Sequence, residues 1–177
     1  QSGLGVWANE FSRERHVIQR YEVDPTLPIH RGWDPGYTGQ AVCISQVNAI
    51  GQLVLFDQVI YKAVPLQKVV QEVNARTRSA IGSARQIDSS DHRMHIVAPT
   101  VLDYGDPAAR QHNAKGESDI DVLSQHNIRL LTRVTKNRKS DLLEQVRALL
   151  LMRSDGKPGL VVARNSAEMD HVISMFE

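Results

Sequence analysis

The hydrophobic period of this chain changes at Pro65, and that change limits the possible folds more than any other feature of the sequence. Before Pro65, three short runs have strand character: residues 29–33 (IHRGW), 41–48 (AVCISQVN) and 52–61 (QLVLFDQVIY). The turn sequences PGYTG and AIGQ separate them, so the connections are short. Three consecutive strands with short connections predict an antiparallel meander.

Beyond Pro65 the apolar residues recur at helical spacing. Pro65 suits the first position of a helix over residues 65–81, and the apolar residues on one face of that helix are Leu66, Val69, Val70 and Val73. Further strands are predicted at 94–106, 128–134 and 159–163, and further helices at 118–127, 140–152 and 165–176. The order β-β-β-α-β-α-β-α-β-α predicts an α/β fold with a mixed sheet and helices on both faces.

Length and composition predict one domain. Residues 1–28 are expected to form an irregular lead-in, with a short strand or helix in FSRERHVIQRYEV, and residues 29–177 to form the domain itself. A chain of 177 residues with 41% hydrophobic composition can close one core. The single cysteine, Cys43, lies in the apolar run AVCIS and is expected to be a small buried side chain and not a reactive thiolate.

Charge and hydropathy exclude some classes of protein. Twenty-one Lys and Arg against 20 Asp and Glu leave a formal charge of +1, so any nucleic-acid surface must be local. No apolar run approaches the roughly 20 residues of a membrane span, and the first residues lack the basic start and apolar core of a signal peptide. We therefore expect a soluble intracellular protein or domain.

Two aspartates lie at the ends of predicted strands: Asp34 directly follows the first, and Asp106 closes the fourth. If the first strand lies parallel beside the fourth, their carboxylates meet at the end of the sheet where open α/β sheets bind ligands. Two like charges so close repel unless a cation lies between them, which favours Mg²⁺ or Mn²⁺. Such ions activate water and stabilise the leaving oxygen in phosphodiester hydrolysis. Turn chemistry is the competing interpretation, because Asp-Pro-Gly and Gly-Asp-Pro are both good turn sequences.

Other side chains compete for the same roles. Asp103 is an alternative ligand to Asp106, since strand ends are uncertain by a few residues. Seven histidines, with His92 and His95 the closest pair, suggest zinc, but one cysteine and no H-x-x-x-H helix argue for surface histidines instead. The remaining acids considered, expected in loops and at strand edges, are Asp57, Asp88 and Asp91.

Basic residues gather just before the predicted helix 140–152. The cluster consists of Arg133, Lys136, Arg138 and Lys139, and could contact DNA phosphates. Arg110 and Lys115 follow Asp106 closely and are further candidates. The alternative is an ordinary solvated turn.

Several stretches together resemble the nuclease domain in the large subunit of tailed-phage terminases. Residues 10–60 resemble the start of that domain, where a strand ends in Gly-x-Asp-x-Gly, here Gly32, Asp34 and Gly36, and a two-stranded hairpin follows. YGDPAARQHNAKGESDIDVLSQHNIRLL is similar to the family's Gly-Asp-Pro-Ala strand end and the helix after it. NRKSDLLEQVRALL and GKPGLVVARNSAEMDHVISMF resemble a later helix and a final strand-helix segment.

The resemblance implies a ribonuclease H-like fold and a two-metal endonuclease that cuts concatemeric viral DNA during genome packaging in the host cytoplasm. It implies catalytic, metal-binding roles for Asp34 and Asp106 with Mg²⁺ or Mn²⁺. The implied partners are double-stranded DNA and, in the full-length protein, an ATPase domain, a small terminase subunit and a portal, with no membrane.

The sequence also departs from the family pattern. No G-x-x-x-x-G-K-[ST] phosphate loop occurs, so the ATPase motor is expected to be absent. The family's third acid comes from a D-x-x-D-A-like helix, and no such sequence occurs before Glu177. Asp170 is a candidate substitute, but its place on an amphipathic helix assigns it to a solvated face.

Two rival functions stay open. The first is a resolvase-like or integrase-like nuclease of the same fold, which would prefer branched DNA to linear duplex. The second is a non-catalytic module that docks on a portal or another protein, with Asp34 and Asp106 as turn residues.

Overall fold

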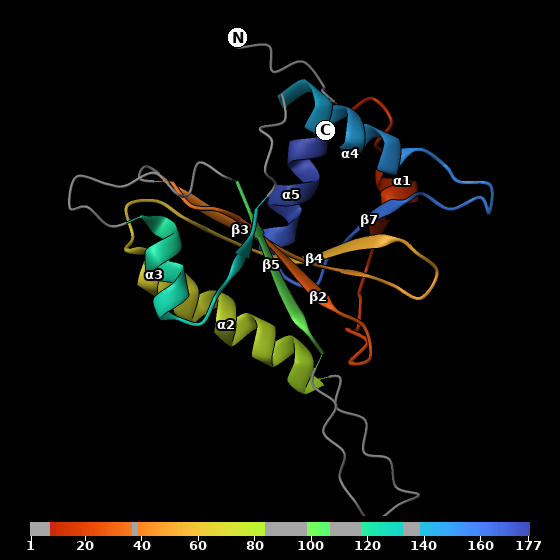
Figure 1. Cartoon of the computed structure of the whole chain (residues 1–177). Helices are drawn as coiled ribbons and strands as arrows, with labels where there is room; N and C mark the ends of the chain where they lie inside the picture. The colour runs from red at the N-terminus through yellow and green to blue at the C-terminus, as the bar shows by residue number, and fades with distance from the viewer. Residues whose placement is uncertain (1–7, 37–38, 84–98, 107–117, 133–138) are drawn as a thin grey trace, which may run out of the picture.

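The computed structural model describes residues 8–36, 39–83, 99–106, 118–132 and 139–177. Its centre is a mixed sheet in the order β1-β7-β4-β3-β2-β5-β6 (Figure 1). The strands are β1 (Val17–Ile18), β2 (Ile29–Asp34), β3 (Gln40–Val47), β4 (Leu53–Tyr61), β5 (Val101–Gly105), β6 (Leu130–Leu131) and β7 (Leu160–Ala163). The helices are α1 (Arg13–His16), α2 (Leu66–Ser83), α3 (Asp119–Gln125), α4 (Lys139–Leu150) and α5 (Glu168–Phe176).

The strand directions follow the predicted pattern. β2, β3 and β4 form the antiparallel meander. β5 lies parallel beside β2, β6 parallel beside β5, β7 parallel beside β4, and β1 parallel beside β7. The predicted mixed α/β sheet is therefore confirmed, and so is the adjacency of the first and fourth strands of the predicted pattern.

Helices pack on both faces of the sheet, with α2 and α3 on one side and α4 and α5 on the other (Figure 1). The larger core joins the apolar faces of α2 and α3 to alternate residues of β2, β3 and β4, with Val69, Val73 and Leu123 almost fully buried. The smaller core joins α5 and the end of α4 to β7, through Leu150, Val162 and Ile173. The change of period at Pro65 thus marks the point where the chain leaves the sheet and begins to cover it.

The N-terminal residues add a strand to the sheet. His16 is buried, donates from Nε2 to the Leu150 carbonyl oxygen at 2.8 Å and accepts at Nδ1 from the Ser12 amide at 3.0 Å. Phe11 stacks on both His16 and Phe176. These contacts place α1 against the C-terminal helices and bring β1 to the edge of β7.

The proline-containing connector before β2 is held by one buried glutamine. Gln46 Oε1 accepts from the Tyr21 hydroxyl at 2.6 Å and from the Asp24 amide at 2.9 Å. Gln46 Nε2 donates to the carbonyl oxygens of Asp24 and Leu27 at 2.9 and 3.0 Å. The connector has few backbone partners of its own, so a side chain of β3 satisfies its polar groups.

Two predicted strands are shorter in the structure than in the prediction. β5 begins at Val101, after Pro99, and residues 94–98 of the predicted run lie outside the described residues. β6 contains only Leu130 and Leu131, because Ile128 turns into the core and Asn127 adopts a positive φ of 60° after α3. Residues 133 and 134 of that predicted strand are again outside the described residues.

No helix in the described part of the chain is long and apolar enough to cross a membrane. Cys43 was expected to be buried, but it is partly exposed on β3, because its side chain lies on the less covered face of that strand. Desolvation of its thiol nevertheless raises the thiol pKa to about 11. This agrees with the prediction that Cys43 is not a reactive thiolate.

Candidate metal and nucleic-acid site

The ends of β2 and β5 lie side by side. The two strands pair in parallel with a constant register: Ile29 lies opposite Val101 at the start of the pairing, and Trp33 lies opposite Gly105 at its end. Continued by one residue, the same register puts Asp34 beside Asp106, the residue that follows β5. Both aspartates are exposed. The strand order assumed from the sequence is therefore present, and it brings the two candidate carboxylates to one end of the sheet.

Asp34 lies on the face of β2 that points away from α2 and the larger core; we call this the open face. Ile29, Arg31 and Trp33 are buried on the α2 side, and side chains of a strand alternate between faces. His30, Gly32 and Asp34 consequently face the other side. On β5, Tyr104 shares that side, since its hydroxyl lies 3.2 Å from His30 Nδ1. α5 and α4 pack over β4 and β7, whereas Gly32, Asp34 and Tyr104 remain exposed.

A buried polar cluster behind the open face holds the two strands in register. Arg31 binds Asp103 with both Nε and Nη2, at 2.6 and 2.8 Å, and the two side chains are 6% and 8% exposed. Trp33 Nε1 donates to the same carboxylate at 2.6 Å, and Arg31 Nη1 donates to Asn74 Oδ1 at 2.7 Å. Three donors thus occupy Asp103, which points away from Asp34. The alternative that Asp103 is the metal ligand is wrong for this arrangement.

The loop after Asp34 depends on a glycine. A Cβ on Gly36 would lie 2.7 Å from the carbonyl oxygen of Gly39, whereas a Cβ on Gly39 would meet nothing closer than 3.8 Å. The first contact is with backbone and cannot be relieved by a side-chain rotation. Only glycine therefore lets the chain turn directly after Asp34 and enter β3.

We expect Gly36→Ala to lower the free energy of unfolding by about 1–3 kcal/mol and to weaken metal binding, because the loop must shift and carry Asp34 with it. Urea denaturation and calorimetric titration with Mn²⁺ measure the two effects. Gly39→Ala is the matched control and should change both values little. Equal effects of the two substitutions would contradict a specific role of Gly36.

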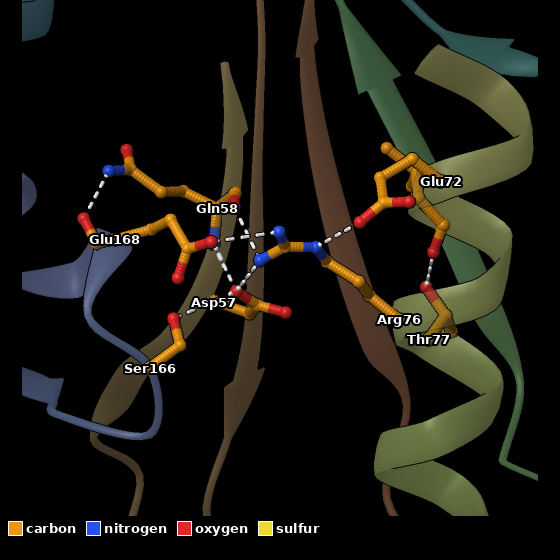
Figure 2. Close-up of polar contacts among 8 residues, drawn as sticks. Asp57, Gln58, Glu72, Arg76, Thr77, Ser166 and Glu168 are labelled. Carbon is orange, nitrogen blue, oxygen red and sulfur yellow. Dashed lines mark hydrogen bonds and ion pairs between the residues drawn. The ribbon is translucent and has the colours of Figure 1, made fainter. Parts of the chain in front are cut away.

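A second polar cluster lies two strands away and is centred on Arg76 of α2 (Figure 2). Its guanidinium binds Glu72 at 2.7 Å, Asp57 at 3.0 Å and Glu168 at 3.0 Å. Ser166 and the amide of Gln58 also donate to the Asp57 carboxylate, at 3.4 and 2.9 Å. Figure 2 shows Arg76 reaching from α2 to β4 and to the start of α5. The cluster ties together helices from both faces of the sheet.

This environment shifts the acid-base equilibria of the cluster. Burial lowers the pKa of Arg76, but hydrogen bonds to Glu72 and Glu168 and the charge of Asp57 outweigh it, so the pKa is raised overall. A hydrogen bond from its own backbone amide, followed by the bond from Arg76, lowers the pKa of Glu168. Asp57 was expected at a strand edge, but it is partly buried in a central strand and engaged by Arg76.

We expect Arg76→Met to lower the free energy of unfolding by about 1–2 kcal/mol at pH 7, since three carboxylates lose a shared partner. The folded-state pKa of Glu168 lies below its ordinary value of 4.5, so its contribution is present above that pH and is lost as the pH falls through the folded-state pKa. The difference from the wild type should therefore shrink between pH 7 and pH 3 in urea titrations. Arg20→Met, in an exposed pair with Glu22, is the control and should cost less than about 0.5 kcal/mol.

Several predicted site residues cannot be placed. Arg110, Lys136 and Arg138 lie outside the described residues, and so does the side chain of Lys139 at the start of α4. The same holds for the remaining basic and acidic candidates and the histidine pair: Asp88, Asp91, His92, His95, Lys115 and Arg133. Among the described residues, no three His, Cys, Asp or Glu side chains form a metal-binding group.

The position of Asp170 does not suit a third metal ligand beside Asp34 and Asp106. It is exposed on α5 and accepts two hydrogen bonds from Arg164, at 2.8 and 3.2 Å. α5 packs on β4 and β7, not on the strands that carry Asp34 and Asp106. The assignment of Asp170 to a solvated helix face agrees with this position.

Three further side chains on or beside the open face were not identified from the sequence. His30 and Tyr104 share the open face with Asp34, and Lys62 lies beside the loop that follows it, with Cγ 3.9 Å from the position of a Cβ on Gly39. Strand alternation could have identified two of them from the sequence. His30 lies four residues before Asp34 and Tyr104 lies two residues before Asp106, so each shares a face of its strand with that aspartate.

The same fold occurs in the large terminase of a thermophilic bacteriophage. Two crystal forms of that terminase match with a TM-score of 0.64 and 16% sequence identity, covering 96% of this chain and 37% and 36% of the terminase chain. The same terminase in complex with ADP matches with a TM-score of 0.59 and 15% identity. This chain thus spans little more than a third of the length of that protein.

Comparisons of sequence add no further relative: no protein-family model matches the chain, and no curated protein matches it. The structural match nevertheless extends over nearly all of the chain and includes the mixed sheet that carries the strand ends. In fold, therefore, this chain is similar to a region of a phage large terminase, and it contains the mixed α/β sheet that the sequence predicted.

Proposed function

We propose that this chain is the nuclease domain of a terminase large subunit, a metal-dependent endonuclease that cuts concatemeric viral DNA during genome packaging. The observation that carries the proposal is the parallel, in-register pairing of β2 with β5, which brings the positions of Asp34 and Asp106 together. The fold, similar to part of a large terminase over 96% of the chain, supports it.

The donors at the strand ends fit Mg²⁺ or Mn²⁺. Asp34 and Asp106 are exposed carboxylates at one end of the sheet, and hard divalent cations prefer oxygen ligands of this kind. Asp103 is not available to them, because Arg31 and Trp33 already bind its carboxylate. When bound, a pair of such cations activates water and stabilises the leaving oxygen of a phosphodiester.

The protein would orient the two carboxylates through contacts in and beside the sheet. The Arg31–Asp103 ion pair joins β2 to β5 three residues before the aspartates, and Gly36 allows the turn directly after Asp34. Asp34 is the last residue of a strand and Asp106 directly follows one, so both lie next to the rigid sheet on which precise sites are built. Lys62, exposed beside the same loop, is placed to contact a DNA phosphate.

We also propose that this domain belongs to a longer protein with further partners. The region matched is little more than a third of the phage terminase, so an ATPase domain, a small subunit and a portal are proposed partners of a larger protein in the host cytoplasm. Double-stranded DNA is the proposed substrate of the domain itself.

The decisive assay is cleavage of supercoiled plasmid by the purified chain with Mg²⁺ or Mn²⁺ and with EDTA. We expect cation-dependent nicking and linearisation that Asp34→Asn abolishes. A preference for four-way junctions over linear duplex would favour the resolvase-like alternative. Cation binding that persists after both aspartates are replaced would favour the docking module, and either result would reject the proposal.

We also propose that Arg110, Lys136, Arg138 and Lys139 contact DNA phosphates. Replacing Lys136, Arg138 and Lys139 with alanine should reduce the slope of log K against log salt by about 2.7, since each phosphate contact contributes about 0.9. Fluorescence anisotropy of a labelled duplex over a salt series measures the slope. A slope equal to that of the wild type would reject the cluster.

A further inference from the structure

Gly32 lies in the middle of a central strand without a structural reason for being glycine. It pairs with Cys43 of β3 on one side and with Tyr104 of β5 on the other, and the register is unbroken on both sides. The position is therefore not a β-bulge. Among the described residues, the glycines with positive φ are Gly51 and Gly156, so the backbone at Gly32 also suits any other residue.

Packing does not require glycine at this position either. A Cβ built on Gly32 would meet no atom within 4 Å, and the residue is exposed. A glycine inside a strand costs about 0.5–1 kcal/mol relative to alanine. The chain bears this cost where alanine would fit, and the result is an open slot above β2.

The walls of the slot are polar. On one side lies His30, and Tyr104 lies across from Gly32 on β5. The His30 ring nitrogen and the Tyr104 hydroxyl are 3.2 Å apart, and the two ring centroids are 5.7 Å apart. On the other side lies Asp34, the next residue of β2 on the same face. Residues two apart in a strand are separated by about 6.5–7 Å, so His30 and Asp34, which are four apart, leave about 13 Å between them above Gly32, enough for one backbone group of a ligand.

We propose that the sugar-phosphate backbone of DNA enters this slot and contacts the strand at Gly32, beside the phosphate that is cut. Glycine inside a strand is typical of places where another backbone approaches closely. Tyrosine hydroxyls and other neutral donors commonly bind phosphate and sugar oxygens, and Tyr104 stands directly across from Gly32. The proposal rests on the proposed nuclease function and names two residues, Gly32 and Tyr104, that bind its substrate.

Gly32→Ala tests the proposal because it fills the slot without disturbing the fold. Gly82→Ala is the matched control, since a Cβ there also meets nothing within 4 Å and Gly82 is exposed near the end of α2. Three properties are measured for both variants and the wild type: the melting temperature, the calorimetric affinity for Mn²⁺, and the affinity for a labelled duplex by fluorescence anisotropy in EDTA.

For Gly32→Ala we expect an equal or higher melting temperature, unchanged Mn²⁺ affinity and DNA affinity at least about tenfold weaker, a loss of about 1.4 kcal/mol. Gly82→Ala should match the wild type in DNA and Mn²⁺ affinity. Tyr104→Phe removes only the hydroxyl and should weaken DNA binding without changing the melting temperature by more than a few degrees.

Three results would overturn the inference. DNA affinity of Gly32→Ala within about twofold of the wild type would mean that the slot does not receive DNA. A lower melting temperature for Gly32→Ala would mean that glycine is required by the fold. If the wild type itself binds no DNA, the nuclease proposal fails together with this inference, whereas normal wild-type binding with unchanged variants removes the inference alone.

Discussion

The double variant Asp34→Asn, Asp106→Asn should lose cation-dependent DNA cleavage and bind Mn²⁺ at least about 100-fold more weakly than the wild type. Asparagine keeps the shape of each side chain but removes the negative charge that attracts the cation. Because both residues are exposed, the free energy of unfolding without metal should change by less than about 1 kcal/mol. Plasmid cleavage, calorimetry and urea denaturation measure the three quantities.

The matched control is Asp170→Asn, which changes another exposed aspartate that is paired only with Arg164 among the contacts described. It should cleave DNA and bind Mn²⁺ like the wild type. The wild type should also melt at a higher temperature in Mn²⁺, because a ligand of the native state stabilises it, and the double variant should not. Metal-dependent stabilisation that survives in the double variant would contradict the assignment.

The second large effect is expected on stability. Asp103→Ala should lower the free energy of unfolding by about 3–5 kcal/mol, because it leaves the Arg31 guanidinium buried without its partner. The Trp33 indole also loses the acceptor of its 2.6 Å hydrogen bond. Urea denaturation at 25 °C measures the change, and the same variant should bind Mn²⁺ more weakly at temperatures where it is still folded.

Replacing the whole pair separates charge from packing. Arg31→Met combined with Asp103→Leu removes both charges and keeps most of the volume, so it should regain most of the stability that Asp103→Ala loses. Arg13→Met, which breaks an exposed pair with Glu177, is the control and should change the free energy of unfolding far less than Asp103→Ala does. A small loss for Asp103→Ala would mean that Arg31 finds another partner and that the pair does not fix the register of β2 and β5.

Much of the fold could be predicted because the local signals agree with it. The change of period at Pro65, the turn sequences between the first three strands and the alternation that follows were sufficient for the mixed sheet and for the adjacency of β2 and β5. β1 was not predicted with certainty, because two residues carry no period. It exists through distant contacts, chiefly the bond of His16 to Leu150.

The candidate site was predictable only in part. Asp34 and Asp106 were predicted because turn sequences mark strand ends and because the Gly-Asp-Pro match favours Asp106 over Asp103. The sequence contains one further indication of the strand register. The pairing of β2 with β5 that puts Asp34 beside Asp106 also puts Arg31 opposite Asp103, and these two residues form an ion pair in the core. The slot at Gly32 exists because no atom lies within 4 Å of the position of a Cβ there, and the sequence alone does not reveal this.

The central claim is that Asp34 and Asp106 together hold the catalytic cations, and anomalous diffraction from crystals soaked in Mn²⁺ tests it most directly. The method locates the cation whether or not the chain turns over substrate. We predict an anomalous peak between the two carboxylates at the ends of β2 and β5. No peak there, with each carboxylate bonded only to its own turn, would contradict the nuclease assignment.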